Sequence, residues 1–255
     1  MRINQVKQKL AGGGTVLGTM VFEFSSPGLP ALLVAAGAEF ALYDMEHSGF
    51  TMAEMRRQFA YCRGLGLVPI VRPPSKTYAA VSQLLDIGAM GLMFQMVESR
   101  QEAEELVRWT RYPPRGVRGA MFGGAHDDYN TVNVADTMRA ADERTFILAM
   151  IETKKGAENM EEILSVPDID GGHLGQFDLS LSLGMPGQFD RSEIQSIIDR
   201  LANTCKRLGK TAACMAPNME TARDWKKRGF RMISYSADSA LLQNALRGAL
   251  RELGD

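Results

Sequence analysis

The chain has 255 residues, of which 45% are hydrophobic and 23% charged, with 29 basic and 30 acidic side chains and a formal net charge of −1. This composition is typical of a globular protein with a large apolar core. Charges of both signs are mixed along the chain, and no apolar run reaches the roughly 18 residues needed to cross a bilayer, so we expect neither a nucleic-acid nor a membrane partner.

Cysteine usage and the N-terminal segment indicate a cytoplasmic protein. The three cysteines, Cys62, Cys205 and Cys214, show no C-x-x-C spacing, so the sequence predicts neither a disulfide framework nor a zinc site. The segment MRINQVKQKLAGGG indicates a short polar helix followed by a glycine break, and it lacks the apolar stretch of a signal peptide. We therefore expect a reduced, cytoplasmic setting.

Eight short apolar runs follow one another along the chain, with helical segments between most of them. The runs span residues 16–22, 40–45, 67–72, 90–97, 146–152, 171–177, 211–216 and 231–236. Most are continuous rather than alternating, as expected for parallel strands covered on both faces. Segments with apolar residues spaced i, i+3 and i+4 lie between them, at 52–62, 78–87, 103–110, 194–208 and 222–228.

Eight alternating β and α units in a chain of this length predict an α/β fold, a (β/α)8 TIM barrel, with one domain over residues 1–255. A doubly wound open sheet is the alternative, but no G-x-G-x-x-G sequence follows any of the runs. The longest gap, residues 97–146, contains the segment RYPPRGVRGAMFGGAHDDYN. Its prolines and glycines indicate a long loop at one face of the barrel.

Polar side chains gather where the apolar runs end, which in a TIM barrel is the rim that carries the active site. They are Asp44, Glu46, His47, Arg72, Gln95, Glu152, Gln176 and Asp178. The last two runs end in residues of little charge. The sequence therefore predicts one polar site at the carboxyl ends of the second to sixth strands.

Glu152 and Asp178 are the candidate ligands of a hard divalent cation. Such a cation needs only one or two protein carboxylates when substrate oxygens and waters complete its shell. The alternative for Glu152 is that it caps the segment TKKGAENM or pairs with Lys154 or Lys155. The alternative for Asp178 is that it caps the turn DLSLSL.

His47 is the candidate base, because an imidazole titrates near neutral pH and a carboxylate such as Asp44 can fix its tautomer. The alternative is a half-exposed histidine bonded to a loop carbonyl. Arg72 suits a carboxylate or phosphate group, and its alternative is an ion pair with an acid such as Asp86. His173 lies within a run, where we expect a satisfied core histidine.

Six motifs resemble, in order along most of the chain, those of the HpcH/HpaI aldolase family. They are DMEH (44–47), PIVRP (69–73), LLDIGAMGLMF (84–94), TRYPPRGVRG (110–119), IET (151–153) and GQFDLSLSLGMPG (175–187). Members are class II, metal-dependent aldolases that act on pyruvate-type donors. The resemblance implies a TIM barrel assembled as a homo-oligomer, a hexamer or trimer of dimers, with C-terminal helices exchanged between neighbours.

The resemblance also implies a metal and its ligands. Glu152 and Asp178 would bind a divalent ion, Mg²⁺ or Mn²⁺ with Co²⁺ or Zn²⁺ as alternatives, and Glu46 would reach it through water. Arg72 would contact the oxygens of the keto acid and stabilise its enolate. No run ends in a lysine, which disfavours a Schiff-base route to the same carbanion.

The implied reaction is the reversible retro-aldol cleavage of a 4-hydroxy-2-keto acid to pyruvate, or a related 2-keto acid, and an aldehyde. His47, oriented by Asp44, would move the proton, and Asp86 would contact Arg72 or the aldehyde, within one subunit or from a neighbour. Two alternatives stay open. One is a synthase of the same superfamily with a different acceptor, and the other is a barrel that only binds a ligand.

Four residues depart from the family pattern and are expected to alter the pocket wall. Gln176 and Phe177 stand where members commonly have a proline and a small residue beside the donor carboxylate. Gln95 and Met150 stand where many have proline and glutamine. The expected base and metal ligands are kept, so these departures affect the choice of substrate more than the class of reaction.

Overall fold

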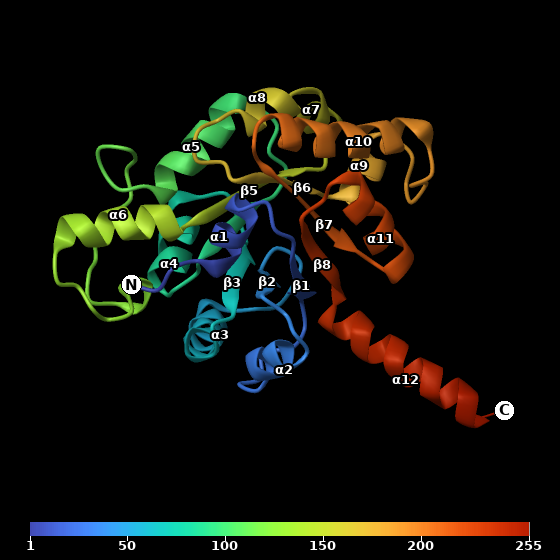
Figure 1. Cartoon of the computed structure of the whole chain (residues 1–255), viewed down its shortest axis with the longest axis horizontal. Coiled ribbons are helices and arrows are strands. Elements are labelled where there is room, and N and C mark those ends of the chain that lie inside the picture. The colour runs from blue at the N-terminus through green and yellow to red at the C-terminus, as the bar shows by residue number, and fades with distance from the viewer. Residues whose placement is uncertain (255) are drawn as a thin grey trace.

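Eight parallel strands close into a barrel in the computed structural model, which describes residues 1–254 (Figure 1). Neighbouring strands pair in sequence order, and β8 pairs with β1 to close the barrel. The predicted TIM barrel is therefore confirmed. The strands are β1 Val16–Val21, β2 Phe40–Asp44, β3 Val68–Arg72, β4 Gly91–Phe94, β5 Phe146–Ile151, β6 Gly171–Leu174, β7 Thr211–Ala216 and β8 Met232–Ala237.

Helices surround the barrel, and several begin at a side-chain cap. Thr51, for example, forms a reciprocal capping box with Glu54 at the start of α3. No helix within residues 1–254 is both long enough and apolar enough to cross a membrane. The helices are α1 Gln5–Ala11, α2 Leu29–Ala35, α3 Met52–Leu65, α4 Tyr78–Asp86, α5 Arg100–Thr110, the 3-10 turn η1 Ala125–Asp127, α6 Val134–Arg144, α7 Lys154–Glu158, α8 Met160–Leu164, α9 Gln176–Ser182, α10 Ser192–Arg207, α11 Met219–Arg228 and α12 Asp238–Gly254.

The strands are continuously apolar because each one separates two cores. Successive side chains of a strand point to opposite faces. In β2, Phe40 and Leu42 belong to the core inside the barrel, whereas Ala41 and Tyr43 belong to the core between strands and helices. Both faces are buried, so the sequence shows no polar alternation.

The sequence misplaced one boundary that matters for the site. The run 171–177 was expected to be a single strand, but β6 ends at Leu174 and α9 begins at Gln176. Gln176 and Asp178 therefore lie in the first turn of a helix and not at the end of a strand. The sequence also missed α2, α7 and α8, which are helices of five to seven residues and too short to show a periodic pattern.

The long loop rich in proline and glycine lies at the opposite end of the barrel from the strand ends that carry the polar residues. It follows α5 and precedes α6, so it connects to the amino end of β5. Asp128 in this loop accepts a hydrogen bond of 2.6 Å from the backbone N–H of Arg2 and lies 3.4 Å from Nε of Arg63. These contacts hold the loop against the N-terminal segment and α3.

The buried carboxylate of Asp238 joins the two strands at which the barrel closes. This residue begins α12 directly after β8, and its oxygens accept backbone N–H groups that follow β1, from Phe22 and Glu23 at 3.0 Å and from Phe24 at 2.8 Å. One side chain thus satisfies three backbone donors that belong to no strand ladder. It also fixes the course of the chain beyond β1.

We predict that Asp238→Ala lowers the free energy of unfolding by about 2–5 kcal/mol, because several backbone donors lose their acceptor at once. Urea denaturation followed by circular dichroism measures this change. Asp190→Ala, at an exposed position, is the control and should stay within about 0.5 kcal/mol of the wild type. An Asp238→Ala variant as stable as the control would show that these hydrogen bonds do not stabilise the closure of β1 against β8.

Candidate active site

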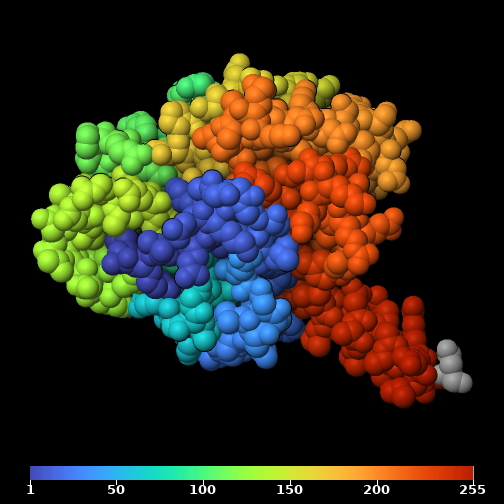
Figure 2. All heavy atoms as spheres, in the orientation of Figure 1, coloured from blue at the N-terminus to red at the C-terminus, as the bar shows by residue number. Residues whose placement is uncertain are grey.

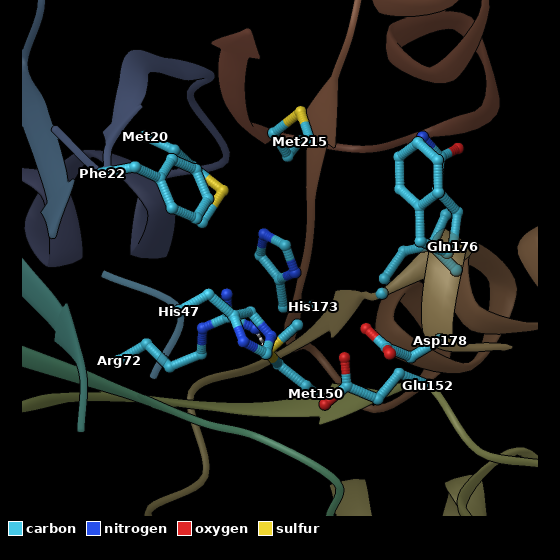
Figure 3. A pocket seen from close by; sticks show the side chains of 13 residues that line it. Met20, Phe22, His47, Arg72, Met150, Glu152, His173, Gln176, Asp178 and Met215 are labelled. Atoms are coloured by element: carbon cyan, nitrogen blue, oxygen red, sulfur yellow. Dashed lines mark hydrogen bonds between the residues drawn. The ribbon is translucent and has the colours of Figure 1, made fainter. Parts of the chain in front are cut away.

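A cavity of about 270 Å³ lies at the carboxyl ends of the strands (Figure 3). It receives side chains from the ends of β1, β2, β3, β5, β6 and β7 and from the first turn of α9. This is the end of a TIM barrel at which catalytic groups are placed. The lining residues are Met20, Phe22, His47, Arg72, Met150, Glu152, His173, Leu174, Gly175, Gln176, Phe177, Asp178 and Met215.

Asp44 shapes the loop after β2 and is completely buried. Its Oδ1 accepts the backbone N–H groups of Glu46 and His47, both at 2.8 Å, and its Oδ2 pairs with the guanidinium of Arg72. The expectation that Asp44 orients the imidazole of His47 was wrong, because Asp44 bonds the backbone of that residue and not its ring. The loop turns back on Asp44 because a short carboxylate readily accepts N–H groups two and three residues ahead.

Glu46 lies between Arg72 and His47. Its Oε2 is 3.0 Å from Nη1 of Arg72 and 3.6 Å from Nε2 of His47. Glu46, and not Asp44, is therefore the carboxylate beside the imidazole. The side chain of His47 is 57% exposed, so its ring stands at the open mouth of the cavity.

Arg72 ends β3 and is almost fully buried, held by the carboxylates of Asp44 and Glu46. Its Nε has no hydrogen-bond partner among the described residues, and Nη1 lies 3.9 Å from Sδ of Met150. A buried guanidinium fixed by two carboxylates and still able to donate suits an anionic ligand. The arginine is thus held in place before any ligand arrives.

Asp86 does not contact Arg72 within one chain, so that expected contact was wrong. It ends α4, at the opposite end of the barrel, where its Oδ1 lies 2.8 Å from Nη2 of Arg118. The sequence pattern could not reveal this, because Asp86 and Arg118 meet through tertiary packing. A contribution of Asp86 to the site of a neighbouring subunit stays a prediction.

Glu152 follows β5 and is 1% exposed. Its Oε1 accepts the backbone N–H of Met96 at 2.6 Å, and its Oε2 has no partner among the described residues. Burial raises the pKa of Glu152 to about 7, and the nearby charge of Asp178 adds to the rise. A Cβ atom on Gly175 would lie 2.2 Å from Oε2, so only glycine lets the neighbouring strand pass this close to the carboxylate.

The alternatives considered for the two candidate metal ligands do not match the structure. Thr153, not Glu152, caps α7, and the ammonium of Lys155 pairs with Glu98 at 3.4 Å. At the start of α9 the capping residue is Gly175, and Asp178 makes no capping hydrogen bond. Neither carboxylate therefore has the capping role considered for it, and Glu152 does not pair with Lys155.

The charges of the cavity favour a bound cation. The carboxylates of Asp44, Glu46, Glu152 and Asp178 gather around the single guanidinium of Arg72. No cluster of three or more His, Cys, Asp or Glu side chains in residues 1–254 is arranged to hold a metal alone. Two carboxylates, of which Glu152 has an unpartnered buried oxygen, nevertheless fit a hard divalent ion whose other ligands are substrate oxygens and water.

The residues that depart from the family pattern take different positions relative to the cavity. Gln176 is buried, whereas Phe177 is half-exposed and packs edge-on against Phe189, with ring centroids 4.9 Å apart. Phe177 thus stands at the rim and does not fill the cavity. Gln95 donates to the carbonyl of Pro73 at 3.0 Å and does not line the cavity.

Sequence reasoning missed several lining residues. Met20, Phe22 and Met215 make one wall apolar, at the ends of two strands that carry no charge. His173 was expected to be a satisfied core histidine, but its ring faces the cavity and neither ring nitrogen has a hydrogen-bond partner. The signal for His173 was its place two residues before Gly175 on the strand that leads to the site.

Comparison with known proteins agrees with this architecture. The sequence pattern of the HpcH/HpaI aldolase/citrate lyase family matches residues 20–245. A hydroxypyruvate/pyruvate aldolase of Pseudomonas aeruginosa is 32% identical over 246 residues, which cover 96% of this chain and 91% of that protein. A 4-hydroxy-2-oxo-heptane-1,7-dioate aldolase of Shigella sonnei is 30% identical, covering 98% of this chain and 95% of that protein.

The fold comparison gives the same result. The crystal structure of an HpcH/HpaI aldolase from Desulfitobacterium hafniense superimposes with a TM-score of 0.93 at 30% sequence identity, covering 98% of this chain and 96% of that one. Sequence and fold therefore agree over almost the entire length. The chain belongs to the HpcH/HpaI aldolase/citrate lyase family.

Proposed function

We propose that this protein is a divalent-metal-dependent aldolase that reversibly cleaves a 4-hydroxy-2-keto acid to pyruvate, or a related 2-keto acid, and an aldehyde. The observation that carries the proposal is the pairing of Glu152 and Asp178 in one cavity with the held guanidinium of Arg72 and the exposed imidazole of His47. The relatives named as aldolases support the same class of carbon–carbon lyase.

Arg72 and the two carboxylates divide the task of binding the keto acid. Glu152 and Asp178 would hold the metal, and Mg²⁺ or Mn²⁺ suits such oxygen ligands. When bound, the metal supplies Lewis-acid stabilisation of the keto oxygen. The guanidinium of Arg72 donates to the oxygens of the keto acid, on which negative charge develops as the carbon–carbon bond breaks. Asp44 and Glu46 keep that guanidinium in place.

His47 acts as the base at the mouth of the cavity. His47 takes the proton of the C4 hydroxyl, and the bond between C3 and C4 breaks. The aldehyde leaves, and the electron pair of the broken bond remains on the keto acid as an enolate. His47 then gives this proton to C3, which completes the keto acid. Glu46, with Oε2 3.6 Å from Nε2 of His47, is the carboxylate next to the ring.

We also propose that the protein is a homo-oligomer, a hexamer or trimer of dimers, in which α12 packs on a neighbouring copy. The helix extends away from the barrel (Figures 1 and 2). Of its described residues only Asp238 is buried, and four leucines on one face are exposed, namely Leu242, Leu246, Leu250 and Leu253. An apolar stripe of this kind on one helix favours burial against another subunit.

We predict that the enzyme exchanges the C3 protons of pyruvate with D₂O in the presence of Mn²⁺ or Mg²⁺, as followed by NMR. The rate should fall to background on adding a chelator and by about 10²–10⁴-fold in His47→Ala, because proton transfer loses its base. Retained metal-induced thermal stabilisation of His47→Ala is the control for an intact site. Exchange without cleavage of any 4-hydroxy-2-keto acid would point to the synthase alternative, and no exchange by the metal-loaded wild type would refute the proposal.

Glu152→Gln should change stability in a manner that depends on pH. The pKa of about 7 lies above the ordinary 4.5, so the metal-free wild type loses stability as the pH rises from about 4.5 to about 7. The neutral variant avoids this loss. Without metal it should be more stable than the wild type above pH 7 by about 2–3 kcal/mol, with the difference vanishing near pH 4.5.

Thermal denaturation across this pH range tests the Glu152 prediction. Mn²⁺ should raise the melting temperature of the wild type above pH 7 but not that of Glu152→Gln. Glu158→Gln, exposed on the adjoining helix α7, is the matched control and should respond to metal as the wild type does. A metal response shared by Glu152→Gln would remove Glu152 from the metal site.

Leu246→Glu combined with Leu250→Glu should lower the molar mass in solution, because charges on the apolar stripe of α12 oppose its burial. Light scattering after size exclusion measures the mass. Asn244→Glu, on the opposite side of the same helix by its spacing, is the control and should leave the assembly intact. An unchanged mass in the leucine variant would mean that α12 does not hold the oligomer together.

A further inference from the structure

His173 is a buried polar side chain with no role in the fold. It lies on β6 and is 2% exposed, and its ring stands in the cavity (Figure 3). Neither Nδ1 nor Nε2 makes a hydrogen bond of normal geometry within residues 1–254. A buried polar group without a partner costs about 1–3 kcal/mol, so an apolar ring would serve packing better.

The surroundings of His173 make it a neutral hydrogen-bonding group. Burial and then the charge of Arg72 lower the pKa of His173 to about 3, against a smaller opposing effect of the backbone of Leu174. A neutral imidazole has one N–H donor and one acceptor nitrogen. Methionines and Phe22 form the apolar wall of the cavity, and no side chain among residues 1–254 hydrogen-bonds the ring.

The register of the barrel sets the depth of His173. Its Cα pairs with those of Met150 on β5 and Ala213 on β7. Glu152 lies two residues beyond Met150, just past the carboxyl end of β5, which places its carboxylate nearer the mouth than His173. A keto acid held at Glu152 and Asp178 therefore has His173 beneath it. The part of the substrate that becomes the aldehyde lies nearer the mouth of the cavity, next to the exposed His47.

We infer that His173 is a specificity-determining residue whose ring hydrogen-bonds a hydroxyl group on C3 of the keto acid donor. The inference rests on the proposed aldolase function. A hydroxyl can donate to the acceptor nitrogen of a neutral imidazole or accept from its N–H, so it fits whichever ring nitrogen faces the donor, whereas a second carboxylate at this depth would find only a neutral partner. A methyl group there would leave the ring unsatisfied. The inference assigns a task to a histidine that neither packing nor proton transfer uses.

Two donors of nearly equal size test this inference. 3-Hydroxypyruvate and 2-oxobutanoate differ at C3 by a hydroxyl against a methyl group. The measurement is kcat/KM for C3 proton exchange of each donor, and of pyruvate, with Mn²⁺ in D₂O, corrected for exchange without enzyme. The wild type should favour 3-hydroxypyruvate over 2-oxobutanoate by about 10–100-fold, because a site built to bond a hydroxyl rejects the analogue that lacks it.

His173→Phe should reduce that preference at least about tenfold, measured as the ratio of the two kcat/KM values so that a general loss of activity cancels. His173→Asn, which keeps a donor and an acceptor, should recover part of the preference. An unchanged ratio in both variants, with pyruvate exchange intact, would overturn the role of His173 alone. A wild type that exchanges none of the three donors would overturn the aldolase proposal itself, and the inference with it.

Discussion

The site depends on an excess of negative charge placed around one guanidinium in a largely buried cavity. Glu152 shows the consequence, since burial raises its pKa to about 7 and the charge of Asp178 acts in the same direction. Such a cluster is stable only when a cation joins it or when a proton neutralises part of it. The same imbalance therefore costs stability in the metal-free protein and creates affinity for a divalent metal.

Arg72 shows why two of these acids, Asp44 and Glu46, cannot be exchanged for apolar residues. Asp44 and Glu46 contact its guanidinium, and Asp44 also holds the backbone of the loop that carries Glu46 and His47. One buried carboxylate thus fixes both the cationic group and the loop with the imidazole. Removing the Asp44 carboxylate would release both the guanidinium and the loop, so Asp44 is a positioning residue. The carboxylate next to the imidazole is that of Glu46.

The two ends of the barrel have different tasks. The carboxyl ends of the strands hold the cavity, while α1 closes the amino ends, with Val6 and Leu10 in the inner core and Asn4 donating to the carbonyls of Met90 and Arg144, both at 3.0 Å. The long loop and the ion pair of Asp86 also lie at this closed end. Substrate choice within one chain is therefore left to the cavity wall, which includes His173 and the methionines Met20, Met150 and Met215.

Sequence alone determined the barrel and most of the rim. Eight apolar runs can be counted because strands buried on both faces carry few polar residues, and polar side chains at their ends mark the active rim. The residues of DMEH, Arg72, Glu152 and Asp178 were found this way. Only the tertiary structure decided that Asp44 bonds the backbone of His47, that Asp86 pairs with Arg118, and that His173 faces the cavity without a partner. Those facts depend on distances between strands and loops far apart in the chain, which local periodicity does not encode.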